Sequence, residues 1–309
     1  MAERRCLADH RVPVHRCLYR CAPIRFSDGQ LYGTLCCLSS CPDQTLNDRD
    51  LDTLRVFAEF SGRLLETQAR RERDQEVIVR RIRSVLSDHL YQVVYQPIVD
   101  VVHNRIVGYE ALARFQPDPQ RSPDLWFGEA ARVGLQCELE MGLIEEALKG
   151  LAHIGDAYLS VNVSPETMLT GAVQRLLDKQ PLNRLMLEVT EHASVTDYQT
   201  VNEALAPLRG KGLALAVDDA GAGYASFRHI LQLKPDVIKL DGSLIRGIDR
   251  NGDCRALASA LIRFGHETGS KIVAECVETE AELEILRELQ VGKAQGYLLG
   301  RPLSFAATG

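Results

Sequence analysis

The stretch LALAVDDAGAGY, residues 213–224, places two adjacent aspartates at the end of a short apolar run, and a glycine-rich turn follows them. Two neighbouring carboxylates repel each other and are costly to remove from water, so packing alone does not explain Asp218 and Asp219. A short apolar run bounded by turn signals is typical of a buried strand. The pair therefore indicates a strand whose end binds positive charge.

Similar short runs lie on both sides of this stretch, and most of them are separated by 15 to 25 residues with helical spacing. The runs cover residues 91–100, 105–115, 157–164, 185–191, 236–241, 271–278 and 293–300. Repeated β-α units with apolar strands predict a buried, largely parallel sheet. Eight candidate strands over about 215 residues favour a closed (β/α) barrel over an open doubly wound sheet.

Almost every candidate strand ends in polar side chains. They are Glu110, Asn162, Glu188 with Glu191, Asp218 with Asp219, Lys239 with Asp241, Glu275 with Glu278, and Gln295. The carboxyl ends of the strands of a β/α barrel meet at one mouth, so we expect these side chains to form one cluster. A single such residue is more often a helix N-cap or an ion-pair partner, but so many at strand ends favour a site.

The residue types in this cluster indicate a metal site. Asp, Glu and Asn oxygens favour hard cations such as Mg²⁺ or Mn²⁺ over zinc, which prefers nitrogen and sulfur ligands. Five or six carboxylates could hold two ions roughly 4 Å apart, with one aspartate between them. Lys239 would lie among these acids, where it could orient or deprotonate a water, or neutralise charge in the transition state. The pattern predicts metal-assisted chemistry on a phosphoryl group.

The bulk composition limits the other classes of function. The chain has 309 residues and a formal charge of −6, which argues against a binder of nucleic-acid polymers. The opening MAERRCLADH has no apolar signal core, and no run is long enough for a membrane span, so we expect a cytoplasmic protein. Six of the nine cysteines lie in the first 41 residues, and we expect thiols there rather than disulfides or a zinc site.

The residues before 91 predict a smaller segment. A turn signal at residues 27–29 lies between two apolar stretches and is typical of a hairpin, and helical spacing follows over residues 46–66. Residues 66–76 carry seven charges and indicate a solvated helical connector. Apolar spacing resumes over residues 77–90, and this stripe could pack on the next domain or on a second copy of the helix.

The motifs of residues 90–305 resemble those of the EAL domains, bacterial phosphodiesterases that hydrolyse cyclic di-GMP. YEALARF contains Glu-Ala-Leu-x-Arg at residues 110–114, and VNVSP, LEVTE, VDDAGAGYASF, DVIKLDGSLI, AECVE and AQGYLLGRPL follow in the family's order. The resemblance implies a modified TIM (β/α)8 barrel over residues 91–309, conversion of cyclic di-GMP to linear pGpG with two Mg²⁺ or Mn²⁺ ions, and a homodimer. Ala220 and Cys276 depart from the family pattern, which has phenylalanine and glycine there.

The resemblance also implies a role for each matching residue. The metal ligands would be Glu110, Asn162, Glu188, Asp218 and Asp219, and Asp218 would bridge the two ions. The catalytic groups would be Lys239, Glu275 and Glu191, of which Glu191 would steady the loop after Asp219. The substrate contacts would be Arg114, Leu112 and Gln295, and the supporting acids would be Asp241 and Glu278. The alternative is a non-catalytic cyclic di-GMP receptor, or a regulatory partner protein that signals through the linker helix. Receptors of this type usually lose metal ligands, and none is lost here.

The hairpin and helix near the N-terminus resemble the last third of a GAF domain. The stretch APIRFSDGQLYGTLCCL, residues 22–38, and the helix after it carry this resemblance. The resemblance implies a partial GAF-like α+β segment over residues 1–69 and a helical linker over residues 70–90. Most of a GAF sheet is absent, and a partial sheet leaves an unpaired edge. We therefore do not expect this segment to bind a small ligand.

Overall fold

A computed structural model describes residues 17–39, 47–116, 121–190, 197–221 and 225–305. The chain divides into two compact units, Met1–Val77 and Ile78–Gly309. Within the described ranges, we find no helix with the length and apolar content that a membrane span requires.

The first unit contains the predicted hairpin. Strands β1 (Cys17–Arg25) and β2 (Leu31–Ser39) pair in antiparallel orientation. Gly29 has a φ of +83° in the turn between them, and the Asp28 carboxylate accepts a hydrogen bond from the Gln30 N–H at 2.8 Å. These are the conformations that glycine and aspartate supply in tight turns, so the turn signal in the sequence is confirmed.

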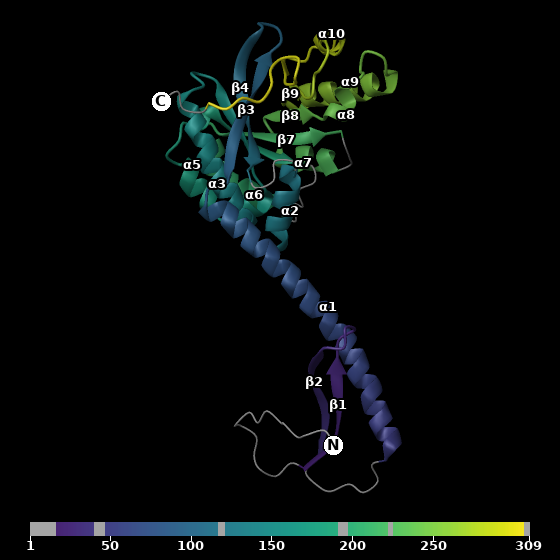
Figure 1. Cartoon of the computed structure of the whole chain (residues 1–309). Coiled ribbons are helices and arrows are strands. Elements are labelled where there is room, and N and C mark those ends of the chain that lie inside the picture. The colour runs from purple at the N-terminus through teal and green to yellow at the C-terminus, as the bar shows by residue number, and fades with distance from the viewer. Residues whose placement is uncertain (1–16, 40–46, 117–120, 191–196, 222–224, 306–309) are drawn as a thin grey trace. The chain divides into compact units, whose positions relative to one another are not determined.

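One long helix, α1 (Asp48–Ser87), follows the hairpin (Figure 1). It includes nearly all of the predicted helix, the charged connector and most of the apolar stripe after it. In the first unit, Leu54 and Ala58 of α1 pack against Ala22 and Ile24 of β1. A Cβ atom on Gly62 would lie 2.4 Å from the Arg25 carbonyl oxygen, so only glycine permits this close approach of helix to strand.

The second unit is a closed eight-stranded barrel with the strand order β10-β3-β4-β5-β6-β7-β8-β9. Its strands are β3 (Tyr91–Asp100), β4 (Arg105–Phe115), β5 (Tyr158–Asn162), β6 (Leu185–Thr190), β7 (Ala214–Ala220), β8 (Val237–Leu240), β9 (Lys271–Ala274) and β10 (Lys293–Ala294). Strand β3 is antiparallel to both of its neighbours, and all other pairs are parallel. The predicted modified TIM barrel is confirmed, with each expected strand present.

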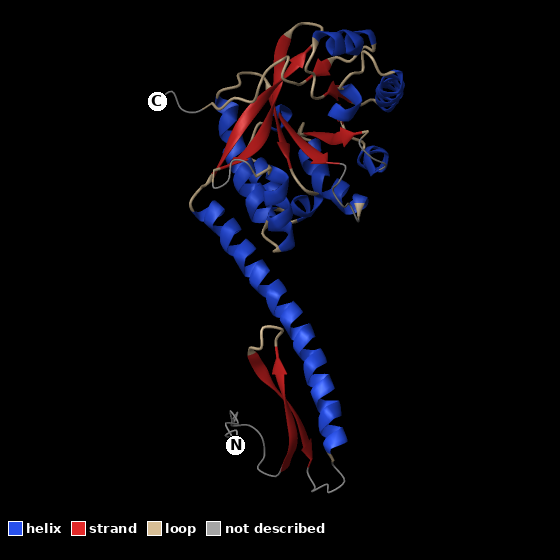
Figure 2. Cartoon of the chain, turned by 45° about the vertical axis from the view of Figure 1, so that its right-hand side comes forward, coloured by secondary structure: helices blue, strands red, loops and turns tan. Residues whose placement is uncertain are grey.

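Helices surround the barrel strands (Figure 2). They are α2 (Pro123–Arg132), α3 (Gln136–Leu148), α4 (Pro165–Leu169), α5 (Ala172–Leu177), α6 (Tyr198–Arg209), α7 (Ala225–Leu233), α8 (Gly242–Ile245), α9 (Gly252–Thr268) and α10 (Glu280–Glu288), with 3₁₀ turns at Lys149–Ala152 and Leu182–Arg184. The last turns of α1 belong to this unit, where Ile78, Ile82 and Val85 are buried in the main core. The apolar stripe predicted before residue 91 therefore packs on the barrel domain.

A second, smaller core fills the inside of the barrel. It consists of Ile98, Met186, Ala216, Val237 and Val273, which come from different strands. Side chains two residues apart on a strand point to the same face. On four of these strands, the residue two positions after the core residue therefore also points inward, and it is polar. These polar residues are Glu188 after Met186, Asp218 after Ala216, Lys239 after Val237 and Glu275 after Val273. This smaller core thus lies directly below the polar side chains inside the barrel.

Candidate active site

Lys239 is the centre of the candidate site. It is 1% exposed, and its Nζ atom lies within ion-pair distance of four carboxylates. The distances are 2.7 Å to Glu188 Oε2, 2.7 Å to Glu275 Oε1, 3.1 Å to Asp218 Oδ1 and 3.3 Å to Glu110 Oε2. One ammonium and four ionised carboxylates carry a net charge of −3. A buried excess of negative charge this large requires added cations or protons.

A bulge in β7 explains how two consecutive residues both reach this site. Neighbouring residues of a regular strand point to opposite faces. The register between β7 and β8 shifts between Val217 and Ala220, and Asp219 has a φ of +56°. The Asp219 N–H donates a hydrogen bond to Asp218 Oδ1 at 3.0 Å. The left-handed conformation of Asp219 in the bulge changes the direction of the backbone, so that both carboxylates face the mouth of the barrel.

The carboxylates form two clusters that share one residue. Glu110, Glu188 and Asp218 each place an oxygen within 4.8 Å of the others, and so do Asp218, Asp219 and Glu275. Oxygen-only clusters suit Mg²⁺ and Mn²⁺. Asp218 belongs to both sets and is therefore the residue that the two clusters share.

The pKa values of the ionisable groups in the cluster shift in different directions. Burial raises the pKa of Glu188 to about 8, against the attraction of Lys239, and burial also holds the pKa of Glu275 well above its ordinary value. Burial acts on Glu110 too, but Lys239 and Gln295 outweigh it and lower that pKa. Burial disfavours the charged form of Lys239, yet the surrounding carboxylates hold its pKa well above its ordinary value. The ammonium therefore stays charged near neutral pH, while some carboxylates hold protons that a cation would displace.

Amide side chains hold Glu110 in place from both sides. Asn162 Nδ2 donates to Glu110 Oε1 at 3.3 Å, and Gln295 Nε2 donates to Glu110 Oε2 at 2.6 Å. The same Gln295 Nε2 also donates to Gln96 Oε1 at 3.2 Å. Gln295 Oε1 is buried without a hydrogen-bond partner in the described part of the chain. This unpartnered acceptor in the cluster is a position where a bound water or ligand would be held.

Two buried residues of this site were not predicted from the sequence. Gln96 lies on β3 and connects Gln295 to the Gly300 carbonyl oxygen, to which its Nε2 donates at 3.2 Å. The Ser160 hydroxyl donates a short hydrogen bond to Glu188 Oε1. Both residues lie inside strands rather than at strand ends. The signal that would have found Ser160 is the period of two, because Ser160 precedes Asn162 by two residues on β5.

The other predicted residues occupy different places. Leu112 and Arg114 follow Glu110 at intervals of two on β4, and Arg114 Nη1 donates to the Ala113 carbonyl oxygen at 2.8 Å. The Asp241 carboxylate caps α8 by accepting from the Ser243 N–H at 2.9 Å, and Glu278 Oε1 lies 3.8 Å from Arg246 Nε. Glu191 lies outside the described residues.

The two departures from the family pattern are accommodated differently. Ala220 is fully buried at the end of β7, where packing leaves it no exposed surface. Cys276 has a φ of +55°, a left-handed conformation that glycine adopts at little cost. Its thiol lies against Gly242, where an added Cβ atom would be 2.8 Å from the sulfur. The sequence therefore places a side chain at a position whose backbone suits glycine.

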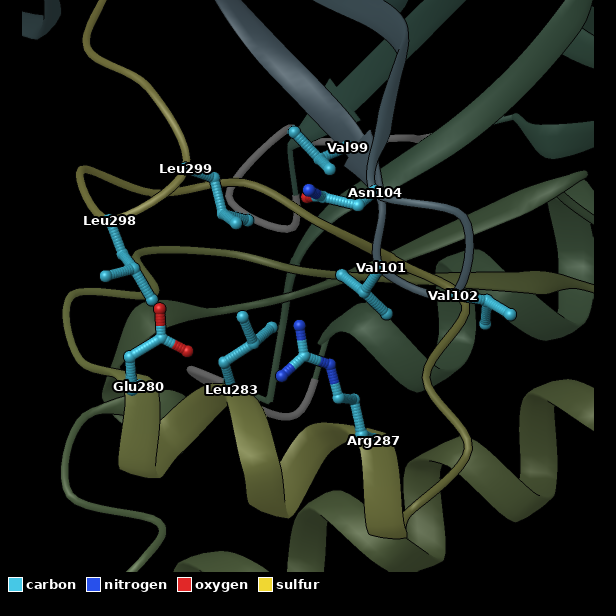
Figure 3. Close-up of a pocket in the computed structure, with 9 residues that line it drawn as sticks. All are labelled: Val99, Val101, Val102, Asn104, Glu280, Leu283, Arg287, Leu298 and Leu299. Atoms are coloured by element: carbon cyan, nitrogen blue, oxygen red, sulfur yellow. The ribbon is translucent and has the colours of Figure 1, made fainter.

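A separate pocket of about 570 Å³ lies beside α10 (Figure 3). Val99 at the end of β3 and Val101 in the turn that follows form one wall, and Leu283 and Arg287 of α10 form another. None of the carboxylates around Lys239 lines it. The carboxylates that could hold a cation lie instead in the cluster around Lys239, where their ion pairs pack the space closely.

Proteins of related sequence include two that are named as cyclic di-GMP phosphodiesterases. The cyclic di-GMP phosphodiesterase NbdA of Pseudomonas aeruginosa is 32% identical over 266 residues, which cover 82% of this chain and 34% of that protein. The bifunctional diguanylate cyclase/cyclic di-GMP phosphodiesterase MucR of the same organism is 30% identical over 245 residues, which cover 74% of this chain and 36% of that protein. The chain thus spans about a third of the length of these relatives.

Solved structures and two family models also match this chain. The PaMucR phosphodiesterase in a c-di-GMP complex has a TM-score of 0.66 and 29% identity, covering 74% of this chain and 98% of that one. A manganese/cyclic di-GMP complex of Klebsiella pneumoniae BlrP1 has a TM-score of 0.62 and 30% identity, covering 69% of this chain and 56% of that one. The GAF domain model matches residues 5–65, and the EAL domain model matches residues 79–302. With this match over most of its length and a closed barrel of the same fold, the chain belongs to the EAL domain family.

Proposed function

We propose that this chain is a metal-dependent phosphodiesterase that hydrolyses cyclic di-GMP to linear pGpG. The observation that carries the proposal is the sharing of Asp218 between two carboxylate clusters around the buried Lys239. The names of its relatives and the cyclic di-GMP in related structures support the choice of substrate.

The donor set fits two divalent cations, Mg²⁺ or Mn²⁺. Glu110, Asn162, Glu188 and Asp218 would hold one ion; Asp218 and Asp219 would hold the other, with Glu275 within reach. Two such ions lower the pKa of a bound water and stabilise the charge that develops on the phosphoryl group. The excess of carboxylates over the single ammonium of Lys239 supports this assignment, because divalent cations would replace the protons that Glu188 and Glu275 hold in the absence of metal.

The side chains around these sites would then take distinct roles. The raised pKa of Lys239 favours a charged ammonium that orients the attacking water and neutralises the transition state, rather than a general base. Glu275, whose Oε1 lies 2.7 Å from Lys239 Nζ, would be the proton acceptor beside it once a bound cation has displaced its own proton. Leu112, Arg114 and Gln295 would face the substrate, and Glu191 would steady the loop after Asp219. Asp241 and Glu278 would support the site from α8 and its neighbouring loop.

We also propose that the barrel forms a homodimer through α7 and α9. Phe227 and Leu231 of α7 and Leu257 of α9 are 40%, 57% and 42% exposed. The Phe227 ring contacts the Phe264 ring edge-on at 6.1 Å, which joins the two helices into one apolar surface. Large exposed apolar side chains on adjacent helices are typical of protein interfaces.

The decisive experiment follows pGpG by chromatography after adding cyclic di-GMP to the purified chain with Mg²⁺, Mn²⁺ or EDTA. We expect product with at least one metal and none with EDTA. Glu110→Ala should abolish it, while Asp178→Asn, which alters an exposed ion pair with Lys211, should not. Binding without product would favour the receptor instead, and neither binding nor product would favour the regulatory partner protein.

A further inference from the structure

Two thiols face each other across the N-terminal hairpin. Cys21 on β1 and Cys36 on β2 are opposite each other in the strand register, and their Sγ atoms are 2.7 Å apart. Both are half-buried, and both are thiols in the structure. This sulfur–sulfur contact lies outside the EAL match, so the proposed phosphodiesterase function does not explain it.

The backbone around this pair meets the geometric requirement for a disulfide. Directly opposite residues of an antiparallel pair have Cα atoms about 4.5–5.5 Å apart. A disulfide spans Cα distances of about 4.4–6.8 Å, so the bond needs no change of register. The next pair along the strands, Ala22 and Leu35, packs toward α1. Because successive side chains alternate, Cys21 and Cys36 lie together on the other face of the hairpin.

We propose that Cys21 and Cys36 are a peroxide-reactive pair that closes to an intramolecular disulfide. One thiolate attacks a hydroperoxide oxygen, which forms a sulfenic acid and releases an alcohol, or water when the oxidant is hydrogen peroxide. The second thiol attacks that sulfur and releases water as the S–S bond forms. Two thiols thus lose two electrons and two protons, and the peroxide O–O bond is reduced. A thiol reductant reverses the change.

The neighbouring Cys37 provides a matched control. It lies on the same strand and is exposed, but it is opposite Arg20 in the register. Its side chain therefore points to the face opposite to that of Cys36. If accessibility alone controlled oxidation, Cys37 would react at least as readily as Cys36. If the cross-strand contact controls it, only Cys36 forms a bond with Cys21.

The test uses the full chain, reduced, desalted and treated with one equivalent of hydrogen peroxide. Remaining thiols are alkylated, and the protein is digested with trypsin without reductant. Tryptic peptides 21–25 and 26–49 separate these two cysteines. We expect them to appear as one linked species, two hydrogens lighter than the separate thiols, that dithiothreitol divides. Circular dichroism of each variant verifies that it is folded.

The variants decide which sulfur is involved. Cys36→Ser should lose the linked species, and Cys37→Ser should keep it at the wild-type yield. Cys21→Ser and Cys36→Ser each remove one member of the pair, so dimedone should trap a sulfenic acid on the remaining thiol in at least one of them, whereas the wild type should show little adduct because the second thiol resolves it. An equal yield of linked peptides from Cys36→Ser would overturn the proposal. So would a wild-type chain that oxidises at Cys37 while peptides 21–25 and 26–49 stay separate.

Discussion

Lys239 Nζ and Asp218 Oδ1 lie 3.1 Å apart in the interior of the barrel, and Asp218 is also the residue that two carboxylate clusters share. The lysine supplies the one positive charge in the set, and the aspartate connects the two places where further positive charge fits. Removing either residue should therefore impair metal binding or turnover more than removing a carboxylate that belongs to one cluster alone.

Asp218→Asn should impair both cation sites, whereas Asp219→Asn should impair one. Asp218 belongs to both clusters and Asp219 only to the second. Titration calorimetry with Mn²⁺ should give two ions per chain for the wild type, one for Asp219→Asn, and weak or no binding for Asp218→Asn. Equal stoichiometries for the two variants would contradict a shared ligand.

Lys239→Ala should lower turnover by about 100-fold or more, because a preorganised donor in a dry site is typically worth that much. Binding of cyclic di-GMP should change much less, since the substrate contacts we propose are Arg114, Leu112 and Gln295. The measurement is kcat from pGpG release, beside the affinity from equilibrium binding. Lys239→Arg keeps the charge and serves as the control for net charge. Wild-type turnover in Lys239→Ala would show that the assigned role is wrong.

Ser160→Ala should weaken Mn²⁺ binding by about 10-fold, because residues that hydrogen-bond a metal ligand orient it. The Ser160 hydroxyl donates to Glu188 Oε1, and Ser160 is fully buried. Ser164→Ala is the matched control. Ser164 caps α4 by accepting from the Thr167 N–H, so this change should cost about 1 kcal/mol of stability without altering metal affinity. If both variants bound Mn²⁺ equally well, Ser160 would not position the ligand.

The metal-free protein should lose stability as the pH rises from about 5 to about 8. Burial raises the pKa of Glu188 from 4.5 to about 8, so the folded state binds more protons than the unfolded state in this window. The free energy of unfolding then falls with rising pH. The raised pKa of Lys239 adds stability that is constant here, because both states stay protonated below pH 10.5.

Thermal unfolding in EDTA at these two pH values measures this effect. Mn²⁺ should reverse the trend, because a cation replaces the displaced protons and binds more tightly at higher pH. Glu188→Gln removes the titrating group and should flatten the metal-free profile. If the metal-free wild type became more stable toward pH 8, then burial would not raise the pKa of Glu188 in the folded protein, and the prediction would be wrong.

The strand ends in the sequence were enough to predict the barrel and most of the cluster. Apolar runs that end in acids identify each strand, and the parallel fold brings their carboxyl ends together. Gln96 and Ser160 were missed because they lie inside strands, where a polar residue looks like an interruption of the apolar run. The continuity of α1 was also not predictable, because an exposed polar helix and a solvated connector have the same composition.

The sequence by itself thus determined which residues form strands, in what order, and which polar side chains each strand carries toward the mouth. Only the tertiary structure decided which of these groups touch. Closure of the barrel places β10 beside β3, so that Gln295 reaches Gln96 and Glu110, which are about 200 positions away along the chain. The bulge at Asp219 turns a second carboxylate inward against the normal alternation. These contacts depend on backbone geometry and closure over long sequence separations, which the local residue pattern does not encode.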